Sequence, residues 1–221
     1  MTEKITIETL DEPATTRRPA HVLRPGFGLL AAGAGAEAVA RVLYVPWWDD
    51  ADRYIGDIVA HRGVHLTGAV LSFAAAIVIT VAISRLWAAA NTNRTTGTAL
   101  TAALLFPVGL AAGAAIAFLT GSFAADADRA AAVATWQDAW TSAGADLGWW
   151  TAMLGALALT VAVTGLARRR TVPRIPAALI GLGALATAVT SAGPVTAILV
   201  TAALLLVAGA GWAAAKATVA Q

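Results

Sequence analysis

Long apolar segments separated by short polar ones dominate the pattern of this chain. Each segment is close to the ~20 residues that a helix needs to cross the roughly 30 Å hydrocarbon core of a bilayer. Because lipid offers no hydrogen bonds, the backbone of each segment must pair within a helix. The pattern therefore predicts an all-α fold, a polytopic transmembrane helix bundle of about six spans. The expected spans are residues 25–44, 63–86, 98–119, 148–166, 176–192 and 194–213.

Polar sequence at both ends limits the membrane domain to residues 25–215. Residues 1–24 carry mixed charges without a sustained period, which predicts a disordered cytoplasmic tail. Residues 216–221 form a short C-terminal tail. Arg17 and Arg18 precede an apolar run, as in a cleaved twin-arginine signal, but the residues after them fit that signal poorly.

Most basic residues fall on one side of a six-span arrangement. The positive-inside rule places that side in the cytoplasm, so we expect a plasma-membrane protein with both termini cytoplasmic. Basic residues on the inner side are Lys4, Arg17, Arg18, Arg24, Arg85, Arg94, Arg168, Arg169, Arg170, Arg174 and Lys216, and those on the outer side are Arg53, Arg62 and Arg129.

The two expected outer loops share a short motif, with Ala-Asp-Arg at residues 51–53 and again at residues 127–129. Each loop is long enough for a short helix. Trp136 and Trp140 are four residues apart in the second loop, as expected of a helix whose aromatic face lies in the lipid headgroups. The pattern predicts one or two outer interfacial helices, and it leaves open whether the two halves are a repeat.

Composition agrees with this picture and excludes several classes of chemistry. The chain is 58% hydrophobic and 13% charged, whereas soluble domains are about 45–50% apolar and about 25% charged. It has no cysteine, which excludes disulfides, thiolate metal sites and cysteine nucleophiles. The net charge of +2 gives no reason to expect a nucleic-acid partner.

Glu37 and Arg41 are charged residues inside the first apolar segment. A carboxylate at that depth costs about 2.5–3.5 kcal/mol on insertion scales, so it needs a partner or a function. Arg41 lies one helical turn later and can pair with Glu37. Two interpretations follow, one in which the pair locks helix packing and one in which Glu37 is a proton or ion site in a polar cavity.

Asp57, His61 and His65 are spaced four residues apart before the second span. On a continuous helix they would form one stripe, and two histidines four apart can bind a divalent metal with a carboxylate as third ligand. The alternative is that His61 flanks the membrane while His65 packs inside the bundle. We expect no cofactor, with a divalent metal at these residues as the minority hypothesis.

Two further features concern the helices themselves. Pro107 interrupts the third segment, so a kink is expected there, and Gly109 with Gly113 forms a Gly-x-x-x-Gly pair suited to close helix packing or to a homo-oligomer. Arg168, Arg169, Arg170 and Arg174 form a basic cluster. It is expected to anchor the topology and to contact anionic lipids.

The stretch from Gly165 to Arg174, GLARRRTVPR, and the following IPAALIG resemble a bacterial family of six-span integral membrane proteins. In that family a basic Pro-Arg turn connects the fourth and fifth spans. The resemblance implies six helices and a plasma-membrane location, and the family supplies no activity to carry over.

Three classes of function remain open. We rank first a non-enzymatic accessory or envelope protein that acts through a membrane protein partner or lipids. The second is a small-solute or proton-coupled transporter that uses Glu37. The third is a membrane metal-binding protein that uses His61 and His65. No phosphate-binding loop or Ser-His-Asp set is found in the sequence.

Overall fold

The computed structural model describes residues 20–45, 50–90, 94–124, 128–141, 143–190 and 196–216, and all the regular secondary structure in these ranges is helical. The all-α prediction is therefore confirmed. The helices are η1 Ala20–Leu23, α1 Arg24–Leu43, α2 Ala51–Ala60, α3 Arg62–Ala90, α4 Arg94–Ala103, α5 Leu105–Phe123, α6 Arg129–Thr141, α7 Ala143–Arg168, α8 Arg174–Thr190 and α9 Thr196–Lys216.

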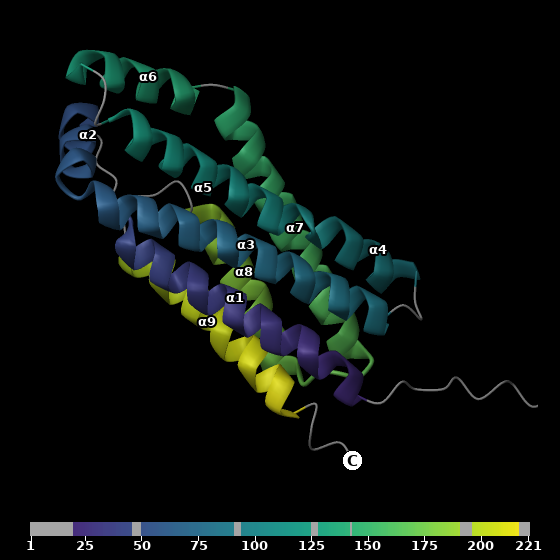
Figure 1. Ribbon diagram of the computed structural model, residues 1–221. Helices are drawn as coiled ribbons and strands as arrows, with labels where there is room; N and C mark the ends of the chain where they lie inside the picture. The colour runs from purple at the N-terminus through teal and green to yellow at the C-terminus, as the bar shows by residue number, and fades with distance from the viewer. Residues whose placement is uncertain are drawn as a thin grey trace, which may run out of the picture.

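The long helices lie lengthwise in one bundle (Figure 1). Going around it, α1 packs on α3, α3 on α5, α5 on α7, α7 on α8, α8 on α9, and α9 returns to α1. These contacts close a ring of helices. Side chains such as Phe27, Phe106, Leu159 and Ile180 are fully buried and belong to one continuous apolar core.

Five helical segments are long and apolar enough to cross a membrane, with α4 and α5 taken together as one; α8 is apolar but shorter. Large aliphatic side chains such as Ile77, Val161 and Leu182 are more than half exposed on the outside of the bundle. In a soluble protein, exposing these side chains to water would cost free energy. Contact with lipid chains carries no such cost, because lipid chains are as apolar as the side chains. The surface and the helix lengths together indicate a membrane-embedded protein.

The third apolar segment is interrupted close to Pro107, where a kink was expected. Helix α4 ends at Ala103, Leu104 forms a turn whose N–H donates to the Thr101 carbonyl at 3.2 Å, and α5 begins at Leu105. Proline has no N–H to donate to the carbonyl four residues earlier, so the regular α-helical ladder stops there.

Small residues bring neighbouring helices into backbone contact. A Cβ at Gly68 would lie 3.1 Å from the Ala40 carbonyl, and Gly155 is in direct contact with the backbone of Phe106. Gly109 is likewise in direct contact with Ala152, but Gly113 faces open space. The Gly-x-x-x-Gly pair therefore does not act as one packing surface within the chain.

Helices α2 and α6 lie together at one end of the bundle, and α1 begins and α9 ends at the opposite end (Figure 1). Trp136 of α6 is only 8% exposed, and its ring lies 5.4 Å from that of Tyr54 in α2. The expectation that Trp136 faces lipid headgroups is therefore wrong, because α2 covers it. The side chain of Trp140 lies outside the described part of the structure.

The helical structure begins inside the segment predicted as the N-terminal tail, residues 1–24. Helix η1 begins at Ala20, and Leu23 is buried in the core although it belongs to the segment predicted to be disordered. Helix α9 extends to Lys216, the first residue of the predicted C-terminal tail. Residues 1–19 and 217–221 lie outside the described residues.

Candidate functional site

Glu37 lies in the second half of α1 and is 1% exposed. Its Oε1 accepts a hydrogen bond from Arg41 Nε at 2.6 Å, and its Oε2 accepts one from Ser72 Oγ at 2.6 Å. The predicted pair of Glu37 and Arg41 is confirmed, because residues four apart share one face of a helix. Each carboxylate oxygen has a donor, as a buried carboxylate requires.

Arg41 and Ser72 connect this carboxylate to its surroundings in different ways. The Arg41 side chain is 11% exposed, and its guanidinium carbon lies 5.6 Å from the centre of the Tyr44 ring, within range of a cation–π contact. Ser72 belongs to α3, so its hydrogen bond joins α3 to α1. Ser72 was not predicted from the sequence, where its only signal is that of a small polar residue within an apolar segment.

His65 is buried in α3 and bonds to two other parts of the chain. The backbone N–H of Val45 lies 3.4 Å from Nδ1, and Nε2 lies 3.1 Å from the carbonyl oxygen of Ala117 in α5. Since an amide N–H can only donate, Nδ1 must be the acceptor and Nε2 must carry the proton. His65 is therefore neutral, and it joins the end of α1 to α5.

This arrangement does not favour a metal at His65. A neutral histidine binds a metal through its unprotonated nitrogen, and here that nitrogen already accepts the Val45 N–H. Among the described residues, no group of three or more His, Cys, Asp or Glu side chains is placed to hold a metal ion.

The stripe expected from Asp57, His61 and His65 is not formed. Helix α2 ends at Ala60, His61 has non-helical dihedral angles, and α3 begins at Arg62. His61 is exposed, and its Nδ1 lies 3.0 Å from the backbone carbonyl of Asp57 instead of the carboxylate. The break at His61 places Asp57 and His65 on two different helices, which ends the four-residue repeat.

Arg62 has a structural role that the sequence pattern does not predict. Its Nε donates to the Gly121 carbonyl at 3.0 Å, and its Nη2 approaches the Ser122 carbonyl at 3.4 Å. Both carbonyls belong to the last turn of α5, where backbone oxygens lack helical partners and the helix dipole is negative. Arg62 therefore caps α5 from α3.

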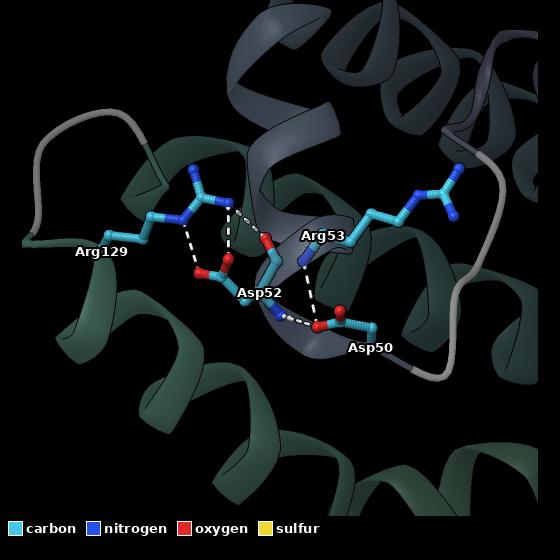
Figure 2. A network of polar contacts seen from close by, with 4 residues as sticks. All are labelled: Asp50, Asp52, Arg53 and Arg129. Carbon is cyan, nitrogen blue, oxygen red and sulfur yellow. Dashed lines mark hydrogen bonds and ion pairs between the residues drawn. The ribbon is translucent and has the colours of Figure 1, made fainter.

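An ion pair connects α2 and α6 (Figure 2). Arg129 Nε lies 2.6 Å from Asp52 Oδ1, and its Nη2 donates to Asp52 Oδ2 at 3.0 Å and to the Asp52 carbonyl at 2.6 Å. Asp50 accepts from the backbone N–H groups of Asp52 and Arg53, which caps the N-terminus of α2. The two Ala-Asp-Arg motifs thus supply opposite partners of one contact.

The hydrogen bond from Arg129 lowers the pKa of the Asp52 carboxyl, and Asp52 in turn raises the pKa of Arg129. Both side chains are more than half exposed, so water screens their attraction. The ion pair therefore fixes the position of α6 relative to the first turn of α2. The stability of the contact between the two helices comes from the buried apolar side chains beneath it. Burial among these contacts raises the pKa of Tyr54.

The predicted basic cluster forms the turn between α7 and α8. Thr171 N–H donates to the Leu166 carbonyl at 3.0 Å, and Arg170 N–H donates to the Ala167 carbonyl at 3.0 Å. With Arg170 at a φ of 58°, these bonds make a Schellman cap, a position usually taken by glycine. Arg168, Arg169, Arg170 and Arg174 are all exposed on this turn.

Helix packing therefore brings Glu37, Arg41, Ser72, Tyr44 and His65 together between α1 and α3, and it separates His61 and Asp57 from them. Comparison with known proteins found no matching family model, no matching curated protein and no matching solved structure.

Proposed function

We propose that the protein is a six-span protein of the plasma membrane with both termini in the cytoplasm. The five long apolar segments and the shorter α8 supply the six spans. Helix α8 has 17 residues, which at 1.5 Å per residue is slightly less than the hydrocarbon thickness, and local thinning of the bilayer accommodates such a difference.

The distribution of charge supports this orientation. Basic residues gather where helices begin or terminate at the end of the bundle away from α2 and α6 (Figure 1). They are Arg24, Arg94, Lys216 and the basic turn at residues 168–174. In the proposed topology this end is cytoplasmic, where the exposed arginines contact anionic lipids. Helices α2 and α6 then lie at the outer interface.

Labelling of single cysteines tests the topology directly, because the natural chain contains none. Gln137 is exposed on α6 and Pro173 is exposed in the basic turn. A membrane-impermeant maleimide applied to intact cells should label the Gln137→Cys variant and label the Pro173→Cys variant only after lysis. The reverse pattern would invert the topology, and labelling of both in intact cells would contradict it.

Within this topology we propose a non-enzymatic role, in which the protein acts through a membrane protein partner or through lipids. The observation that carries this proposal is the enclosure of Glu37. Both of its oxygens are bonded inside the packed contact between α1 and α3. A carboxylate that transfers protons or ions must instead exchange partners and meet water along a pathway.

Proton flux distinguishes this role from transport. Vesicles containing the wild-type protein should retain an imposed pH gradient for as long as vesicles containing the Glu37→Gln variant, measured with an entrapped pH-sensitive dye. Protein-free vesicles give the background leak. Faster decay with the wild-type protein, lost in Glu37→Gln, would establish a proton pathway through Glu37 and overturn the proposal.

A further inference from the structure

A pocket of about 210 Å³ lies between the outer helices and α5. Ile55 of α2, Phe123 of α5 and Trp136 of α6 contribute to its walls, and none of its lining side chains is charged. An engineered apolar cavity of about 150 Å³ admits benzene and stays free of water. This pocket is therefore large enough for part of a hydrocarbon molecule.

The hydroxyl groups in the lining are already engaged. Thr120 donates to the Ile116 carbonyl at 2.8 Å, and Thr135 donates to the Ala131 carbonyl at 2.9 Å, each within its own helix. Their methyl groups remain to contact an occupant. Since a buried water needs two to four polar partners, the pocket favours an apolar occupant over water.

The α5 wall of the pocket continues onto the outside of the bundle. Leu119 and Phe123 line the pocket, yet they are 49% and 43% exposed. Helix α5 is part of a membrane-crossing segment, so the hydrocarbon next to this surface in a bilayer is a lipid chain. Leaving the pocket empty would forfeit dispersion contacts that a neighbouring chain can supply without leaving an apolar environment.

From these observations we infer that the pocket binds a segment of one hydrocarbon chain from a lipid of the outer leaflet. Helices α2 and α6 cover the chain, and the buried apolar contacts between them, such as Tyr54 on Trp136, hold them over it. The inference rests on the membrane placement proposed above, and it gives the lipid contact of that proposal a specific location.

Photolabelling tests the inference with the full-length protein. The protein is placed in phosphatidylcholine vesicles in which a fraction of the lipid carries a diazirine on one acyl chain, near the ester in some molecules and near the chain end in others. Labelled residues are mapped by mass spectrometry. Label is expected on the pocket side of α6, at Trp136 and its neighbours. The Ala132→Leu variant fills the pocket and should lower this labelling about tenfold. A tenfold loss corresponds to about 1.4 kcal/mol of binding free energy.

Ala134→Leu is the matched control, because Ala134 is exposed on α6 and does not line the pocket; it should keep the wild-type labelling. Ala139→Leu, which also fills the pocket, replaces Ala132→Leu if the latter fails to fold. Unchanged labelling in the filled variants would overturn the inference. So would a dimer crosslinked through α6 with no label in the pocket, since a second copy would then be the occupant.

Labelling elsewhere separates this inference from the proposed membrane placement. Ile77 and Leu182 are exposed on the outside of the bundle and should be labelled wherever the protein is embedded. Label at these residues but not on α6 would overturn the pocket assignment alone. Label at neither location would contradict the membrane placement as well.

Discussion

Replacing Arg41 with methionine should lower the free energy of unfolding by about 3–5 kcal/mol, the cost of leaving one partner of a buried ion pair without the other. Methionine keeps most of the length of the side chain but removes the donor to Glu37 Oε1. The Glu37 carboxylate then stays buried between α1 and α3 with Ser72 as its remaining donor. Unfolding in mixed detergent micelles, followed by circular dichroism, measures the change.

Two variants show whether the loss comes from the uncompensated carboxylate. Glu37→Gln combined with Arg41→Met removes both charges and should recover most of the lost stability, since a neutral pair carries no buried ion. Arg169→Met removes an exposed arginine from the basic turn and should leave stability nearly unchanged. If Arg41→Met and the double variant are equally unstable, packing of the arginine stem and not charge determines the effect.

Gly155→Ala should lower the free energy of unfolding by at least about 3 kcal/mol, the upper end of what overpacking a core usually costs. The added methyl group would meet the backbone of Phe106 in α5. A change of rotamer can move a side chain but not a backbone, so α5 and α7 would have to separate. Loss of this contact also weakens the packing of Gly109 on Ala152. The same detergent unfolding experiment applies.

Gly113→Ala is the matched control on α5. Gly113 faces open space, and alanine favours a helix by about 0.8–1 kcal/mol over glycine, so this variant should be as stable as the wild type or slightly more so. Gly211→Ala in α9 provides a second open position. If Gly155→Ala is as stable as these two, α5 and α7 do not pack as closely as described.

Local sequence patterns predicted the elements well. The first segment was expected at residues 25–44, and α1 is Arg24–Leu43, because apolar length and flanking polar residues define a helix without reference to its neighbours. The pairing of Glu37 with Arg41 was predictable for the same reason, since residues four apart always share a helix face. Pro107 likewise acts on its own helix.

Contacts between helices were not predictable in this way. Apolar segments rich in alanine resemble one another, so nothing in the sequence states that Ser72 faces Glu37 or that Arg62 caps α5. The predicted stripe of Asp57, His61 and His65 does not form, because the helix is interrupted at His61. The four-residue spacing alone cannot show such an interruption. Trp136 has the spacing of an interfacial residue, yet α2 covers it.

The sequence by itself determined the helical class, the approximate ends of the helices and the internal ion pair, all of which depend on interactions within one helix. Only the tertiary structure decided which polar residues meet. Asp52 and Arg129 are 77 residues apart, and they meet because the packing of the long helices brings α2 and α6 to the same end of the bundle. The same packing encloses Glu37, engages both ring nitrogens of His65 in hydrogen bonds and leaves the apolar pocket between α2, α5 and α6.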